Sequence, residues 1–238
     1  YAEYISSEDE KFFEKFYNKP ETFETDTKQA NERYINQELK DNSDLFDDLD
    51  GKSLDSQQRE AIVVDEDAVK VIAGIDNFDA ESVKKVVMAA DKAGASAVDI
   101  CANPDIIAMA RSMTELPLFV SSVEPQELAH AVALGADAVE LGNFDALYKK
   151  GQTFTASQVL SLARRTRELV GDDVFFCVTI PGELEISEQI DLARDLENLG
   201  VDLIQTEGHF SNETPSNGVR GLVERAELTI SNTIELSR

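Results

Sequence analysis

A phrase made of a glycine, a short turn and an apolar strand recurs three times, and it limits the fold more than any other feature. The copies begin at Gly94, Gly135 and Gly200 and read GASAVDI, GADAVEL and GVDLIQT. The glycine of each copy suits the left-handed residue that ends a helix. Further apolar strands are expected at 69–75, 118–123 and 174–179. Helical spacing of apolar residues predicts helices at 78–93, 105–113, 125–134, 155–170, 185–199 and 218–236.

Strands that alternate with helices predict a parallel α/β sheet, because each helix returns the chain right-handed over the sheet. The near-identical repeat units favour a TIM-barrel-like (β/α) fold with about six of the eight strand–helix units over residues 69–238. A doubly wound open sheet is the rival architecture, and it usually carries a glycine-rich phosphate loop after its first strand. Here that strand continues into AGIDN, with one glycine, Gly74. The barrel is therefore the favoured prediction.

The six predicted steps have consequences for function. A barrel phosphate site is usually built from the loops after strands seven and eight, which this reading does not contain. Uncovered strand edges and apolar helix faces favour association. The expectation is therefore an incomplete barrel with impaired catalysis that self-associates through its uncovered edges.

Residues 1–68 have a different pattern, with little β-branched alternation. Apolar side chains at helical spacing, interrupted at Pro20, predict an α-helical N-terminal segment. Its last helix is expected to be capped by Ser53 or Asp55 and to run through Val64. Two domains are thus predicted, residues 1–68 and 69–238.

Composition excludes several classes of function. The formal net charge of −25 argues against binding nucleic acid, which requires a positive surface. No apolar run approaches the length of a membrane span, and the first residues resemble neither a signal nor a transit peptide. Cys101 and Cys177 form no disulfide framework or zinc motif. A cytoplasmic location, or the plastid stroma for an algal protein, is expected.

Several phrases of residues 69–238 resemble one known family. They are VIAGIDNF, VDI, VSSVEP, ELGNFD and IQTEG, which begin at Val71, Val98, Val120, Glu140 and Ile204. Together they resemble the "hypothetical chloroplast reading frame twenty-three" family of algal plastids and cyanobacteria. The resemblance implies an aldolase-type TIM barrel.

Residues 1–74 are similar to something else. The phrase LDSQQREAI, which begins at Leu54, resembles the Q motif of UvrD/Rep-type helicases. In that family the glutamine at the position of Gln58 reads the adenine of ATP. The following strand should then enter a Walker A loop, but no Gly-Lys-Thr follows Gly74. The combination suggests a chimera joined within 69–74.

Candidate site residues come from the carboxyl ends of the predicted strands, where TIM barrels carry their function. The predicted catalytic residues are the acids Asp76, Asp99, Glu140 and Glu207. The predicted ligand-binding residues are Asn77, Ser121, Asn143, Thr179, Gln205 and Thr206. Clustered carboxylates raise one another's pKa, which suits acid/base chemistry, or they bind a divalent metal. The alternative is that these acids hydrogen-bond within the barrel layers or face solvent.

A Schiff-base aldolase is not expected. Imine chemistry needs a desolvated lysine at a strand end. Some class I aldolases carry it in a Gly-Ala-Asp-Phe-Ile-Lys-Thr phrase, and Gln205 stands at the matching position here. Lys70 lies at the other end of its strand.

The leading functional hypothesis is an aldolase-type barrel that binds, isomerises or cleaves a small polar metabolite by proton transfer or with a divalent metal. A non-enzymatic binding or structural module is the second hypothesis. A remnant of an ATP-dependent DNA helicase, with Gln58 as its nucleotide residue, is the third.

Overall fold

The structure is a computed structural model that describes residues 54–63, 68–148, 150–207 and 233–237. The chain divides into two compact units, Tyr1–Asp48 and Leu49–Arg238, and the described residues belong to the second. The predicted N-terminal helices before residue 54 and most of the predicted helix at 218–236 lie outside the described residues. Within the described part, no helix is long and apolar enough to cross a membrane.

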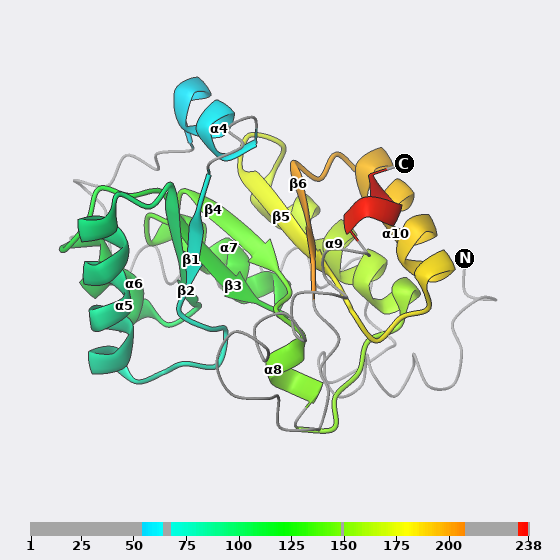
Figure 1. The fold of residues 1–238 in the computed structure, drawn as a ribbon, viewed down its shortest axis with the longest axis horizontal. Helices are drawn as coiled ribbons and strands as arrows, with labels where there is room; N and C mark the ends of the chain where they lie inside the picture. The colour runs from blue at the N-terminus through cyan, green and yellow to red at the C-terminus, as the bar shows by residue number, and fades with distance from the viewer. Residues whose placement is uncertain (1–53, 64–67, 149, 208–232, 238) are drawn as a thin grey trace. The chain divides into compact units, whose positions relative to one another are not determined.

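Strands and helices alternate along this second unit as the sequence predicts (Figure 1). The strands are β1 (Lys70–Ile72), β2 (Ala97–Cys101), β3 (Leu118–Ser122), β4 (Ala138–Leu141), β5 (Phe175–Ile180) and β6 (Leu203–Thr206). The helices are α4 (Ser56–Val63), α5 (Ala80–Ala93), α6 (Pro104–Arg111), α7 (Pro125–Ala133), α8 (Asp145–Tyr148), α9 (Ala156–Val170) and α10 (Ile186–Asn198). The short α8 was not predicted, and β1 is shorter than the predicted strand.

The six described strands form one parallel sheet in the order β1-β2-β3-β4-β5-β6. Helices α5, α6, α7 and α9 each contact both strands that they connect, which is the packing of a (β/α) repeat. The predicted TIM-barrel-like fold is therefore confirmed.

The sheet curls toward a barrel, and one ion pair demonstrates it. Lys70 on β1 contacts Glu140 on β4. Neighbouring strands lie about 4.8 Å apart, so β1 and β4 would be roughly 14 Å apart in a flat sheet. An ion pair requires about 4 Å or less. Even with the reach of a lysine and a glutamate, this contact fits a sheet that curls and directs both side chains toward its concave face.

The two faces of the sheet carry different cores. On the helix side, strand residues such as Val98 and Val120 pack with Val87 of α5 and Ile106 of α6. The concave side holds a smaller cluster, made of Leu54, Ala97, Phe119, Ala138, Phe175 and Cys177. Because successive side chains of a strand point to opposite faces, both faces can be apolar near the strand starts.

The recurring glycine phrase has a structural reason. The third residue of each copy accepts a hydrogen bond from a backbone N–H at or next to the start of a neighbouring strand. Ser96 Oγ accepts from Val69 at 3.0 Å, Asp137 Oδ2 from Leu118 at 2.8 Å, and Asp202 Oδ2 from Phe176 at 2.9 Å. The repeat therefore fixes the register of the strands at their amino ends. It does not contribute these residues to the carboxyl ends, where the predicted site lies.

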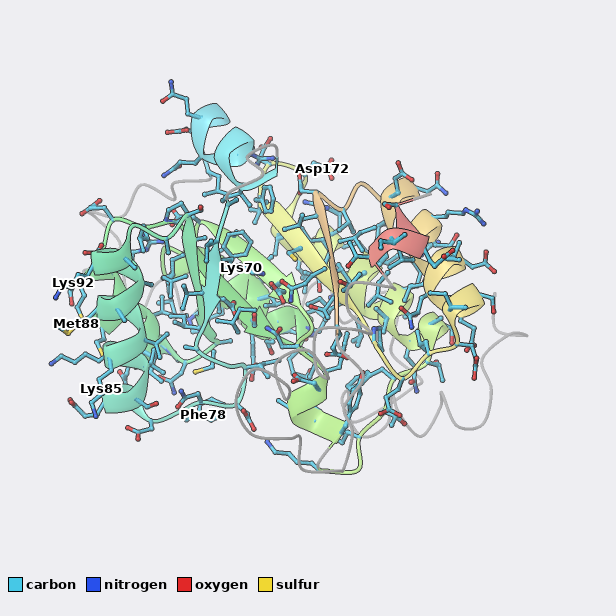
Figure 2. The ribbon with its side chains drawn as sticks, viewed as in Figure 1. Lys70, Phe78, Lys85, Met88, Lys92 and Asp172 are labelled. Atoms are coloured by element: carbon cyan, nitrogen blue, oxygen red, sulfur yellow. The ribbon has the colours of Figure 1, made fainter. Side chains whose placement is uncertain are left out.

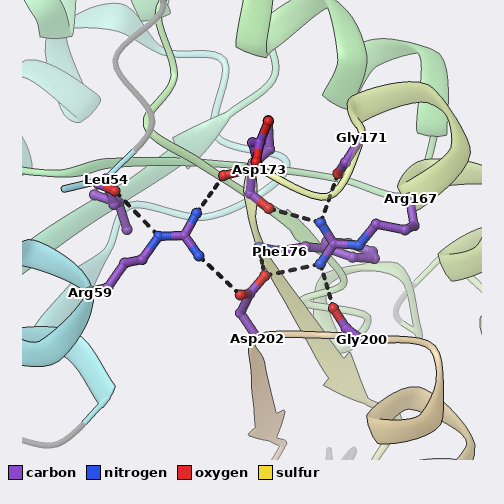
Figure 3. A network of polar contacts seen from close by, with 9 residues as sticks. Leu54, Arg59, Arg167, Gly171, Asp173, Phe176, Gly200 and Asp202 are labelled. Carbon is purple, nitrogen blue, oxygen red and sulfur yellow. Dashed lines mark hydrogen bonds and ion pairs between the residues drawn. The ribbon is translucent and has the colours of Figure 1, made fainter. Parts of the chain in front are cut away.

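Arg59 of α4 links the residues before β1 to the amino ends of β5 and β6 (Figure 3). Its Nη1 lies 3.2 Å from Asp202 Oδ1, and its other nitrogens donate to the carbonyls of Leu54 and Asp173. Arg167 of α9 donates to the second oxygen of Asp202, at 2.9 Å. Helix α4 therefore packs against the start of the barrel, where Leu54 is only 3% exposed.

Gln58 takes part in the start of this helix. Its Oε1 accepts from the Asp55 amide at 3.0 Å, and Asp55 Oδ1 accepts from the Gln58 amide at 2.8 Å. This reciprocal pair is a capping box. The adenine-reading role of Gln58 finds no support in this arrangement, and a capping role accounts for the residue. The predicted domain boundary at residue 68 would place α4 and the strands in different domains, whereas α4 belongs to the same compact unit as the strands.

Candidate functional site

Two carboxyl groups lie inside the curled sheet, above the apolar cluster of its concave face. Asp99 belongs to β2 and Glu140 to β4, and both are 0% exposed. Each lies two residues after an inward-facing alanine of the same strand, Ala97 on β2 and Ala138 on β4. The period-two alternation of the strands therefore places both acids toward the interior.

Hydrogen bonds hold the Asp99 carboxyl from the neighbouring strands. Ser121 Oγ of β3 donates to its Oδ1 at 2.5 Å. Asn143 Nδ2, from the loop after β4, donates to its Oδ2 at 3.3 Å and to Ser121 Oγ at 3.1 Å. Both oxygens of Asp99 are thus oriented by residues from other elements.

Glu140 has partners on both of its oxygens. Its Oε1 accepts from Thr179 Oγ1 of β5 and from Gln205 Nε2 of β6, both at 2.9 Å. Its Oε2 pairs with the ammonium of Lys70. Lys70 also lies over the Phe119 ring, 4.8 Å from its centroid. In contrast to Lys85 and Lys92, which project outward from α5, Lys70 lies on the sheet (Figure 2).

Gln205 and Asn143 join the two carboxyl groups into one network. Gln205 Nε2 lies 3.3 Å from Asn143 Oδ1. Asn143 has a positive φ of 63°, which is uncommon outside glycine and best tolerated by asparagine. The preceding Gly142 has φ 143°, and a Cβ on it would lie 2.4 Å from the Cβ of Thr179. Close contact with β5 therefore requires glycine before Asn143.

Electrostatics differentiate the two acids. Burial raises the pKa of the Asp99 carboxyl well above its ordinary value, and the nearby charge of Glu140 raises it further. Lys70, Ser121 and Asn143 act in the opposite direction. Burial lowers the pKa of the Lys70 ammonium, but the charges of Cys177, Glu140 and Asp99 raise it, and the net shift is upward. A charged lysine is thus held against Glu140, while the pKa of the buried Asp99 carboxyl is shifted upward.

Glu207, another of the predicted acids, lies in a separate buried site. Its Oε1 accepts from the Asp145 amide at 2.8 Å, and its Oε2 accepts from Tyr148 Oη at 2.6 Å and the Gly182 amide at 3.0 Å. Burial raises the pKa of Glu207 even though these donors lower it. The carboxylate connects the loops after β4, β5 and β6.

The remaining predicted site residues have other surroundings. Asp76 forms a half-exposed ion pair with Lys150 at 3.3 Å. Asn77 Nδ2 donates to the Ala73 carbonyl at 3.1 Å within its own loop. The hydroxyls of Thr206 and Thr233 lie 2.7 Å apart. The structure therefore brings Asp99, Glu140, Ser121, Asn143, Thr179 and Gln205 together, and it does not bring Asp76, Asn77, Glu207 or Thr206 into that network.

Two residues of interest were not among the predicted site residues. Lys70 was set aside because it lies at the amino end of its strand, yet it reaches Glu140. Glu124 follows β3, and burial together with Glu127 raises the pKa of its carboxyl to about 7. The lysine could have been found by asking which charge compensates an acid inside the barrel, because buried charges are usually paired.

The acids of the network are committed to other partners. Among the described residues, no group of three or more His, Cys, Asp or Glu side chains could hold a metal ion. Asp99 and Glu140 already accept hydrogen bonds on all four of their oxygens. The arrangement is suited to proton transfer, because a carboxyl with a raised pKa lies beside a charge-compensated pair.

Comparisons with known proteins agree with the resemblance seen in the sequence. A family model described as "Protein of unknown function (DUF561)" matches residues 56–238. The "Uncharacterized protein ycf23" of Pyropia yezoensis is 38% identical over 174 residues, which are 73% of this chain and 63% of that protein. The protein of the same name from Cyanophora paradoxa is 42% identical over 147 residues, 61% of this chain and 60% of its own. This chain thus spans less than two thirds of the length of these relatives.

Solved structures show a weaker likeness. The structure "QR15, an Aldolase" has a TM-score of 0.49 and 16% identity, and the match covers 70% of this chain and 75% of that one. The family match begins before β1 and includes Gln58 and α4. The expected helicase relationship of residues 1–74 finds no support in these matches.

Proposed function

This chain belongs to the family described as "Protein of unknown function (DUF561)", and we propose that it binds a small polar metabolite at the Asp99–Glu140 network and transfers protons to and from it. The observation that carries the proposal is the pairing of two fully buried carboxyl groups with one lysine on the concave face of the sheet. Burial of a charged side chain costs free energy, so a core that serves stability alone favours neutral side chains. A role in function would account for two acids and a lysine at these positions.

The two acids have different roles in this proposal. Glu140 and Lys70 compensate each other's charge. Asp99 is then the group that exchanges a proton, because burial and the neighbouring Glu140 raise its pKa and make its carboxylate a stronger base than an ordinary aspartate. Asn143 and Gln205 are only partly buried, and they form the surface that a ligand would meet first.

The reaction class that fits is proton transfer at a carbon next to a carbonyl group. The Asp99 carboxylate would take the proton, the C–H electron pair would become the C=C bond, and the π pair of the C=O bond would move to the carbonyl oxygen to give an enediolate. Return of the proton to the opposite face of the same carbon gives an epimer. Return to the neighbouring carbon, with transfer of the hydroxyl proton to the former carbonyl oxygen, gives an isomer. Amide and hydroxyl groups at the strand ends can donate hydrogen bonds to the oxygens of a hydroxy-carbonyl compound.

Isotope exchange tests this proposal without knowledge of the net reaction. The full chain is incubated in D2O with a panel of small hydroxy aldehydes and hydroxy ketones, and deuterium on carbon is followed by NMR. The expected result is exchange in at least one compound that Asp99→Asn abolishes. Exchange that persists in Asp99→Asn, or none across the panel, would refute the proposal.

A structural polar core is the second candidate, and one observation favours it. Every side chain of the network has a hydrogen-bond partner within the protein. Substitution of Asp99 by alanine separates the two roles. A strained acidic site gains stability or keeps it, whereas a structural partner loses the stability of its bonds to Ser121 and Asn143. Urea unfolding measures the difference.

The expected location in the cytoplasm, or in the plastid stroma of an alga, is part of this proposal. Its support is the similarity to the ycf23 proteins of Pyropia yezoensis and Cyanophora paradoxa.

A further inference from the structure

Glu207 holds the loop that follows β4, although it lies outside the Asp99–Glu140 network. Its Oε1 accepts from the backbone amide of Asp145, the first residue of α8. Its Oε2 accepts from Tyr148 Oη in the same short helix and from the Gly182 amide after β5. A carboxylate with three donors from two loops fixes the position of both loops relative to β6.

The segment fixed in this way contains a non-glycine residue with a left-handed backbone conformation. Asn143 is the described non-glycine residue with a positive φ, and it lies two residues before Asp145. A left-handed conformation persists only where the surroundings enforce it. On one side Gly142 abuts Thr179 too closely for any Cβ.

The opposite side of Asn143 is also held. The Phe144 side chain is fully buried and packs against Phe154, with ring centroids 4.7 Å apart. The Asp145 amide then meets Glu207. The backbone on both sides of Asn143 is therefore constrained, and Glu207 supplies the polar part of that constraint.

We infer that Glu207 is a positioning residue that acts through Asn143. By holding the Asp145 amide, it keeps the Asn143 side chain aimed at the Asp99 carboxyl. The inference rests on the proposed function, because it concerns the group that would exchange protons. It assigns Glu207 a different role from the catalytic one expected from the sequence.

The experiment measures the titration of Asp99 by carbon-13 NMR of aspartate-labelled full-length chain. The Asp99 carboxyl signal is assigned by its loss in Asp99→Asn. The reference variant is Asn143→Gly, which retains the left-handed backbone at no steric cost and removes only the side-chain amide. Because that amide favours the charged form of Asp99, Asn143→Gly should raise the pKa of Asp99.

Glu207→Gln should shift this titration in the same direction as Asn143→Gly. A glutamine has a similar volume, but its NH2 group faces at least one of the three donors and cannot accept from it. Tyr148→Phe removes one donor only and should give a smaller shift of the same sign. If Glu207→Gln does not fold, the shift in Tyr148→Phe alone tests the positioning role of Glu207.

The matched control is Gln189→Met. Gln189 is buried on α10, and its Nε2 donates to the Leu184 carbonyl at 2.8 Å in the loop after β5. This variant also loses a loop-anchoring hydrogen bond, so its melting temperature should fall, but the Asp99 titration should not move. A general loosening of the barrel would shift both.

The outcomes separate the inference from the proposed function. An unchanged Asp99 titration in Glu207→Gln and Tyr148→Phe, with a shift in Asn143→Gly, overturns the positioning role and leaves the proposed function standing. An Asp99 group that titrates like a surface carboxyl in the unmodified chain overturns the proposed function itself.

Discussion

The ion pair between Lys70 and Glu140 provides the sharpest quantitative prediction. The Lys70 side chain is 13% exposed and that of Glu140 is 0% exposed, so both charges have left most of their water. Substitution of one partner leaves the other buried and uncompensated. Glu140→Gln is the cleanest perturbation, because a glutamine carbonyl can still accept the bonds that Thr179 and Gln205 now donate to Oε1.

The magnitude follows from the burial of the pair. Two unit charges about 4 Å apart attract by about 4 kcal/mol at an effective dielectric constant of about 20. Removal of one partner of a buried pair typically costs about 3–5 kcal/mol. Glu140→Gln should therefore lower the free energy of unfolding by about 3–5 kcal/mol. Lys70→Met should cost at least as much, since it also loses the contact with the Phe119 ring, worth about 0.5–2 kcal/mol.

The double variant is the control. Lys70→Met combined with Glu140→Gln leaves no buried charge without a partner, and replacement of a whole buried pair is often neutral or stabilising. It should therefore be more stable than either single variant. A cost of the double variant equal to the sum of the single costs, within about 0.5 kcal/mol, would refute the reasoning.

Thermal unfolding followed by circular dichroism is a suitable assay. A unit of this size changes its melting temperature by about 2–4 °C per kcal/mol, so each single variant should melt roughly 6–20 °C lower. The chain has two compact units, so hydrogen exchange of the strand amides should show that the loss lies in the barrel. Single variants within about 1 kcal/mol of the unmodified chain would show that the pair is solvated.

Three further predictions concern other parts of the fold. The raised pKa of Asp99 means that the folded chain retains a proton that the unfolded chain releases near pH 4. Stability from this group is therefore present below pH 4 and lost as pH rises through the folded pKa, and Asp99→Asn should remove that loss in urea titrations at several pH values. Gly142→Ala should destabilise by about 1–3 kcal/mol more than Gly94→Ala, because both glycines have positive φ but only the first meets Thr179; equal costs would contradict the close contact. Leu54→Ala should cost about 2–5 kcal/mol in urea unfolding, because this side chain is buried in the apolar cluster of the concave face, and a neutral result would contradict the packing of Leu54 in that cluster.

The order of elements was readable from the sequence because it depends on local signals. A glycine at the end of several helices and the change from helical to strand periodicity are properties of short segments. The same logic placed Asp99, Ser121, Glu140 and Gln205 toward one end of the barrel, since the carboxyl ends of parallel strands share one edge of the sheet. The structure joins these residues in one network.

Residues far apart in the chain were decided only by the tertiary structure. Lys70 contacts Glu140 because the sheet curls, and no pattern within β1 records that curvature. Glu207 and Asp76 have the same chemistry as Asp99, yet the loops that surround them give them other partners. The sequence alone determined which elements form and in what order, because hydrophobic periodicity and helix caps act over a few residues. The charge balance of the site was decided only in three dimensions, because it depends on distances between strands that are set by the curling of the sheet.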